Sequence, residues 1–134
     1  MPRRTIQQFR DERAHGHARL LETEHLGLKR FMSLDAGAYR DGALSSRTKE
    51  LLGLVASTVL RCNDCIDYHL EQCVEQGWSD PEIEDALNVA LLVGGSICIP
   101  HLRHARLSLD ELRAERPGPP GPPPGIPGGT GSAT

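Results

Sequence analysis

Apolar residues over the first 116 positions recur at the three- and four-residue spacing typical of helices. The alternation of apolar and polar residues that marks strands is hard to find, and β-branched runs are short. Aromatic residues make up only 4% of the chain, which further weakens any strand signal. The pattern therefore predicts an all-α bundle of six or seven helices joined by short loops.

In the first half of the chain the pattern predicts three helical segments, a loop, and then a longer helix. The segments cover about residues 5–14, 17–24 and 25–36, the loop covers 39–42, and the longer helix runs from about 45 to 60. Ser45 or Ser46 is the expected N-cap of that longer helix. We expect the apolar side chains of the third segment to point inward: Leu28, Phe31 and Met32. The longer helix is expected to be central because apolar residues cover most of its circumference: Leu51, Leu52, Leu54, Val55 and Val59.

In the second half the helix boundaries carry clearer signals. Gly77 is expected to end the helix that contains the cysteine motif. Ser79 and Glu82 have the spacing of a capping box, with a proline in the first turn of the following helix. Two glycines at 94–95 are expected to end that helix, and the last helix should run from about 99 to 115.

The composition changes sharply after residue 116. Residues 117–134 are rich in proline and glycine and carry no charged side chain, so they lack the means to form a core. We therefore expect one helical domain over residues 1–116 and a disordered tail over 117–134.

Charge and hydropathy exclude several kinds of partner. The net charge is −3 and no long basic run is present, which argues against binding to nucleic acid. The longest apolar run, residues 89–93, is far shorter than a membrane span, and the first residues lack the apolar stretch of a secretory signal. We expect a cytoplasmic protein, and in a reducing cytosol two nearby cysteines more often serve catalysis or metal binding than static cross-linking.

The candidate chemistry is concentrated between residues 62 and 69. Cys62 and Cys65 form a CxxC motif, and His69 follows four residues later. On a helix these three residues occupy positions i, i+3 and i+7 and share one face. Two thiols that can bond to each other, with an imidazole one turn away, indicate a redox or metal-binding site.

A redox reading of this segment assigns different roles to the two sulfurs. A helix N-terminus and a nearby imidazole both favour a thiolate, and His69 lies one turn from Cys65. We therefore expect Cys65 to attack a peroxide, and Cys62 to condense with the resulting sulfenic acid into a disulfide. An external dithiol must then reduce that disulfide. Glu50 needs a partner in its apolar helix and is expected to orient His69 or relay a proton.

These residues resemble the active-site signature of the alkylhydroperoxidase D branch of the carboxymuconolactone decarboxylase family. The matching pattern is Glu50, eleven residues, then the CxxC motif and His69. The similarity covers roughly residues 20–112 and is strongest across 41–95, where it includes Asp41-Gly42-Ala-Leu44, Thr48-Lys49-Glu50-Leu51, Gly77, Ala86-Leu87 and Gly94-Gly95.

The resemblance implies an all-α bundle that assembles as a trimer or hexamer. It also implies a peroxiredoxin-like peroxidase that acts on hydrogen peroxide or an organic hydroperoxide, with a protein or lipoyl-type dithiol as reductant and no cofactor. In that family Cys65 would be the peroxidatic cysteine, Cys62 its proton donor and resolving partner, and Glu50 and His69 the proton relay.

One position departs from the family pattern. The peroxidase branch commonly has a histidine just before the second cysteine, whereas this chain has Asp64. An adjacent carboxylate raises the pKa of a thiol, which acts against peroxide reduction more than against thiol–disulfide exchange. His101 and His104 on the last helix are expected at the surface, with replacement of the missing histidine as the alternative.

Two other functional classes remain open at this stage. One is a dithiol–disulfide oxidoreductase or redox sensor without peroxidase activity. The other is a structural or zinc-binding protein without turnover. Cys73 extends the cysteine face, but it lies about 16 Å from Cys62 along a continuous helix, too far for both to bind one ion. We expect Cys73 and Cys98 to be small buried apolar residues.

Overall fold

The computed structural model describes residues 2–120 of the 134-residue chain. In this part the chain forms six α-helices and one short 3₁₀ turn: α1 (Ile6–Glu22), α2 (Leu26–Ala38), α3 (Ser46–Val59), α4 (Asn63–Glu75), α5 (Asp80–Gly94), η1 (Ser96–Cys98) and α6 (Ile99–Glu115). The described residues contain no strand, so the all-α prediction is confirmed. Most of the predicted tail, residues 121–134, lies outside the described residues.

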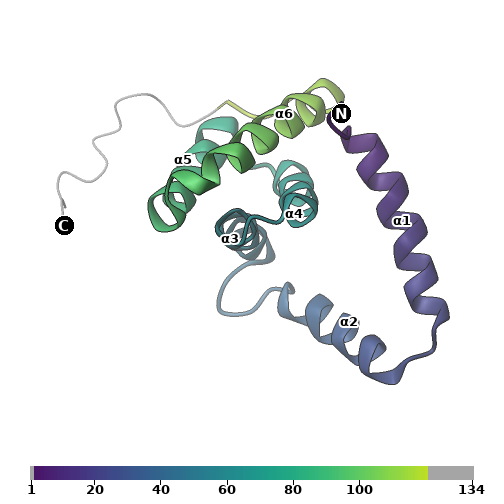
Figure 1. The fold of residues 1–134 in the computed structure, drawn as a ribbon. Coiled ribbons are helices and arrows are strands. Elements are labelled where there is room, and N and C mark those ends of the chain that lie inside the picture. The colour runs from purple at the N-terminus through teal and green to yellow at the C-terminus, as the bar shows by residue number, and fades with distance from the viewer. Residues whose placement is uncertain (1, 121–134) are drawn as a thin grey trace.

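Helices α3 to α6 form the packed part of the molecule, as Figure 1 shows. Helix α3 packs against α4 and α5, and α4 packs against α6. The largest fully buried apolar side chains of these four helices come from all of them: Leu54, Ile66, Leu70, Ile83 and Leu109. The first two turns of α1 close the same core with Ile6 and Phe9.

Local sequence signals account for the helix ends around this core. Ser45 caps α3, and Ser79 and Glu82 form the predicted capping box of α5. Gly77 and Gly95 follow α4 and α5 with φ of 84° and 83°, a backbone region that glycine adopts at little cost. These ends agree with the sequence prediction because each depends on residues close together in the chain.

The N-terminal part differs from the prediction. The segments expected at 5–14 and 17–24 are one continuous helix, α1, which runs through Gly16. A single glycine inside a helix costs only about 1 kcal/mol relative to alanine. The capping box formed by Thr5 and Gln8 stabilises the start of α1 and helps it to continue.

Helix α2 also differs from the prediction, because none of its residues is buried. Phe31 was expected to point inward but is 62% exposed, and Leu34 is 74% exposed. Leu28 and Met32 are only half-buried. In Figure 1, α1 and α2 form an arm that extends along one side of the packed helices.

Helix α3 is central, as predicted. Of the apolar residues expected around it, Leu54 is fully buried, Leu51, Val55 and Val59 are half-buried, and Leu52 is half exposed. The other buried residues of this helix are small or polar: Glu50, Gly53, Ser57 and Thr58. The apolar pattern therefore identified α3 as central but did not indicate that small and polar residues make up much of its buried surface. Over residues 2–120, none of the helices has the length and apolar character needed to cross a bilayer.

Leu54→Ala tests the central position of α3. Leu54 has no exposed surface, and its truncation leaves a cavity between α3 and the helices packed against it, so we expect a loss of about 2–5 kcal/mol in the free energy of unfolding. Leu107→Ala on α6 is the control, because Leu107 is 48% exposed and should change stability by less than about 1 kcal/mol. Urea titrations measure both values, and equal losses in the two variants would contradict this packing.

Candidate functional site

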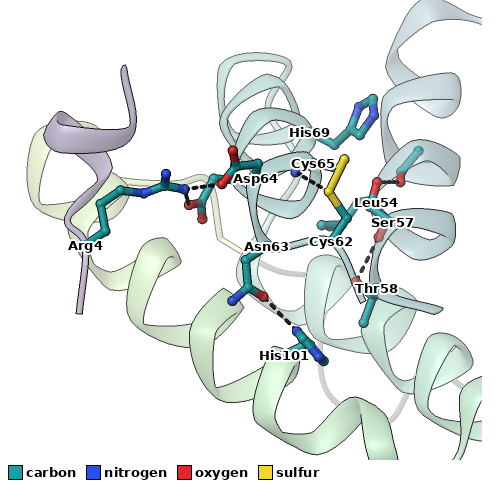
Figure 2. Close-up of a disulfide and its surroundings, with 12 residues drawn as sticks. Arg4, Leu54, Ser57, Thr58, Cys62, Asn63, Asp64, Cys65, His69 and His101 are labelled. Carbon is teal, nitrogen blue, oxygen red and sulfur yellow. Dashed lines mark hydrogen bonds and ion pairs between the residues drawn. A yellow bond between two sulfur atoms is a disulfide. The ribbon is translucent and has the colours of Figure 1, made fainter. Parts of the chain in front are cut away.

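The two cysteines of the CxxC motif form a disulfide where α3 gives way to α4, as Figure 2 shows. The chain leaves α3 through Arg61, which has a φ of 60°, and the Cys62 N–H donates to the carbonyl of Ser57 at 3.0 Å. Cys62 is the N-cap of α4 rather than a residue of its first turn, and its Sγ accepts a hydrogen bond from the Cys65 N–H at 3.2 Å. The Cα atoms of the pair are 5.3 Å apart. The predicted pairing of the two sulfurs is thus sterically possible in this fold.

The two sulfurs differ in their access to solvent. Cys62 is half-buried behind the N-terminus of α4, whereas Cys65 is exposed. Cys65 also lines a cavity of about 340 Å³ between α1, α2 and α4. Cys65, and not Cys62, is among the residues that line this cavity.

A buried pair, Glu50 and His69, lies beside the disulfide. His69 Nδ1 lies 2.8 Å from Glu50 Oε2, and the two residues are 9% and 4% exposed. Glu50 comes from α3 and His69 from α4, so this contact joins the two helices at the core of the site. The contact expected between Glu50 and His69 is present, and the two roles expected of Glu50, orientation of the imidazole or proton relay, stay predictions.

Two residues that the sequence analysis did not single out complete the surroundings of His69. The Tyr39 hydroxyl lies 3.4 Å from His69 Nε2, and the two rings are 5.3 Å apart. Burial, followed by the nearby charge of Glu50, raises the pKa of Tyr39 above its ordinary value. Gly53 leaves room for the imidazole, because a Cβ at that position would lie 2.7–2.9 Å from three atoms of the ring.

The imidazole and the exposed sulfur share a cavity but not a hydrogen bond. His69 and Cys65 both line the 340 Å³ cavity, together with Tyr68 on α4 and Phe9 on α1. Within the described residues, the ring nitrogens of His69 have Glu50 and Tyr39 as their hydrogen-bond partners. The structure therefore places His69 and Cys65 at one cavity without direct hydrogen bonding between them.

Helix α6 holds the other side of α4 through polar contacts. His101 Nδ1 lies 2.8 Å from Asn63 Oδ1, and His104 Nε2 lies 2.8 Å from Asp67 Oδ1. Ser108 Oγ donates to the same oxygen of Asp67 at 2.6 Å. In the described structure the two histidines contact polar side chains of α4 rather than a sulfur. Their geometry does not support a role as substitutes for the family histidine.

Cys73 and Cys98 are free and buried, as predicted. Burial, reinforced by the charge of Glu50, raises the pKa of the Cys73 thiol to about 12, so this thiol is almost entirely protonated at neutral pH. The zinc alternative has no support in the part of the chain that the structure describes, where no group of three His, Cys, Asp or Glu side chains is arranged to hold an ion.

Comparison with known proteins identifies a family and several relatives to which this chain is similar. The model of the carboxymuconolactone decarboxylase family matches residues 27–109. A curated relative from Paracoccus denitrificans, known as uncharacterized protein 4 in the cox locus, is 31% identical over 82 residues, which are 61% of this chain and 74% of the relative.

Three crystal structures are similar to this chain. A Thermotoga maritima protein has a TM-score of 0.79 and 54% identity, over 81% of this chain and 96% of that one. Another structure from Thermotoga maritima has a TM-score of 0.72 and 55% identity over 77% and 91% of the two chains; it is described as a family protein with a suggested involvement in antioxidative response. A Legionella pneumophila family protein, at 23% identity and a TM-score of 0.74 over 80% and 96%, shares the fold.

Gly53→Ala tests whether the site depends on close approach of α3 and the His69 ring. The added methyl group would force the imidazole or the helix to move, so we expect a loss of about 1–3 kcal/mol in the free energy of unfolding. Gly16→Ala is the matched control, because no atom lies within 4 Å of its added Cβ and alanine should stabilise α1 by about 0.5–1 kcal/mol. Urea denaturation separates the two, and a stabilised Gly53→Ala variant would show that this contact is not tight.

Proposed function

The chain belongs to the carboxymuconolactone decarboxylase family, and on that basis we propose that it is a thiol-dependent peroxidase that cycles between two thiols and the Cys62–Cys65 disulfide. The observation that carries this proposal is the disulfide at a cavity that also contains the imidazole of the buried Glu50–His69 pair. The suggested antioxidative role of the Thermotoga maritima protein, which is 55% identical to this chain, is consistent with it.

The exposed sulfur of Cys65 is the proposed nucleophile. Its thiolate attacks one oxygen of a hydroperoxide, so that an S–O bond forms and the O–O bond breaks. The departing oxygen takes a proton and leaves as water or an alcohol, and Cys65 becomes a sulfenic acid. The Cys62 thiol then attacks the Cys65 sulfur and releases water as the disulfide forms. A protein or lipoyl-type dithiol reduces the disulfide and is itself oxidised.

Glu50 and His69 are the proposed proton relay. If Nδ1 donates its proton to the Glu50 carboxylate, the neutral imidazole keeps Nε2 as the proton acceptor. Nε2 lies 3.4 Å from the Tyr39 hydroxyl, and His69 is one of the residues that line the cavity with Cys65. We propose that a proton passes between this nitrogen and Cys65 through water in the cavity.

A second candidate is dithiol–disulfide exchange without peroxide reduction. The observation that favours it is Asp64, which precedes Cys65 and lines the same cavity, so that its negative charge acts against the thiolate. Exchange with another disulfide uses the same two sulfurs and the same reductant. In either case, cycling with cellular dithiols fits the cytoplasmic location that we expect for this chain.

We also propose that the chain forms a homo-oligomer, a trimer or hexamer. Helix α2 presents Leu26, Phe31 and Leu34 to solvent, and α5 presents Val89, Leu92 and Val93. Large exposed apolar groups on two separate helices are typical of surfaces that bind another protein. A second copy of the chain is the proposed occupant because it would cover these residues without a separate partner.

Peroxide consumption with a dithiol reductant tests the proposed activity. We expect Cys65→Ser to abolish turnover, and His69→Ala to slow it roughly 10²–10⁴-fold, as for a lost general base. Cys73→Ala is the control and should keep its activity, because Cys73 is buried outside the cavity. Equal activity in all of these proteins would refute the site assignment. Fast reduction of a small disulfide with no peroxide consumption would instead identify the exchange activity.

Sedimentation velocity tests the proposed self-association. The native chain is expected to sediment as a multiple of its 14.6 kDa mass, and Phe31→Glu with Leu34→Glu should reduce that mass by placing charges in an apolar contact. Leu107→Glu, on the exposed surface of α6, is the control. A native chain that sediments as a 14.6 kDa species at micromolar concentration would contradict the oligomer.

A further inference from the structure

We propose that Arg4 is a positioning residue that offsets the charge of Asp64 and so keeps the Cys65 thiol reactive. Arg4 precedes α1, sixty residues before Asp64, and its guanidinium forms an ion pair with the Asp64 carboxylate. Figure 2 shows the arginine reaching across to the first turn of α4, the turn that carries both Asp64 and Cys65. The inference rests on the proposed function only in taking Cys65 as the reactive sulfur.

The effect of this contact follows from simple electrostatics. Asp64 precedes Cys65 in the first turn of α4, and both residues line the cavity, so the Asp64 carboxylate disfavours a second negative charge on the Cys65 sulfur. A guanidinium keeps its charge at any pH at which a thiol titrates, so Arg4 brings a permanent positive charge to the same place. Arg4, Asp64 and Cys65 all line the same cavity, and the thiolate therefore experiences the ion pair rather than an isolated carboxylate.

Several contacts hold Arg4 in this position. Its guanidinium also reaches Glu12 at 2.8 Å and lies 3.8 Å from Asp67 Oδ2, and it stacks over Phe9 at 5.2 Å from the ring centre. The neighbouring backbone is anchored to α6, because the Ile6 N–H donates to Glu111 at 2.7 Å. An arginine tied down at this many points supplies its charge at a defined place and not as a freely moving surface group.

The net charge of the cavity depends strongly on Arg4, because the other charged groups that line it are mostly carboxylates. The cavity is lined by Glu12 and Arg13 from α1, Asp35 from α2, and Asp64 and His69 from α4. Glu50 of α3 reaches it through His69, while His101 and His104 of α6 are engaged with Asn63 and Asp67. Without Arg4, the three carboxylates that line the cavity would face Arg13 as the one remaining guanidinium among its lining residues.

The pH dependence of Cys65 alkylation tests this inference without using peroxide. The full chain carrying Cys62→Ala is reduced and treated with iodoacetamide, and mass spectrometry follows modification of Cys65 from pH 5 to 10. We expect Arg4→Gln to raise the thiol pKa by roughly 0.5–1 unit, because it leaves Asp64 without its counter-charge. At pH values below the thiol pKa this corresponds to alkylation about three- to tenfold slower.

Companion variants separate charge from structure. Arg4→Lys should restore the native profile, Asp64→Asn should lower the thiol pKa, and the double variant Arg4→Gln with Asp64→Asn should return close to the native value. Arg10→Gln is the control, since Arg10 of α1 pairs with Glu71 and Glu115, which do not line the cavity. It should leave the profile unchanged.

Two results would overturn the inference. One is an unchanged profile in Arg4→Gln, and the other is an equal shift in Arg10→Gln, which would show a general loosening of α1. The outcome is independent of the peroxidase assay, because alkylation reports on the thiolate alone. A chain that shows the expected shift but consumes no peroxide would keep the role of Arg4 and lose the proposed peroxidase activity.

Discussion

The contact between Glu50 and His69 is the interaction on which the arrangement of the site depends. An unpaired carboxylate is costly to bury, so Glu50 at 4% exposure requires a partner, and His69 Nδ1 supplies it at 2.8 Å. Because one residue belongs to α3 and the other to α4, the pair fixes how far one helix is displaced along the other. Gly53 permits this approach by leaving out the side chain that would otherwise meet the imidazole. The same packing fixes the position, relative to α3, of the N-terminus of α4, where the disulfide lies.

One side of helix α4 presents Cys65 and His69 to the cavity, and other sides contact the neighbouring helices. Its N-cap, Cys62, keeps one sulfur half-buried and hydrogen-bonded, while Cys65 in the first turn faces the cavity. Contacts with α6 through Asn63 and Asp67 hold the same turn from another direction. A short helical turn fixed by two neighbours can hold the two sulfurs within bonding distance of each other.

Much of the fold follows from local rules that the sequence displays directly. The caps at Ser45 and Ser79, and the glycines at 77 and 95, mark helix ends through contacts between residues only a few positions apart. The spacing of Cys62, Cys65 and His69 likewise predicts that the three residues share a face, because that prediction depends on positions along a single helix. The prediction of inward side chains on α2 was wrong, because an apolar stripe shows which side of a helix avoids water but not whether this chain covers that side.

By itself, the sequence determined the all-α class and most helix ends, and it indicated the pairing of Cys62 with Cys65 and a contact between Glu50 and His69 as one possibility. Only the tertiary structure decided which distant residues contact His69 and Asp64. Tyr39 reaches His69 from thirty residues away, and Arg4 reaches Asp64 from sixty. No local periodicity encodes such contacts, because they arise only when separate helices have packed and brought distant segments together. The charges around Cys65 therefore depend on the folded chain, which brings Arg4 to Asp64, as well as on the CxxC motif that contains Asp64.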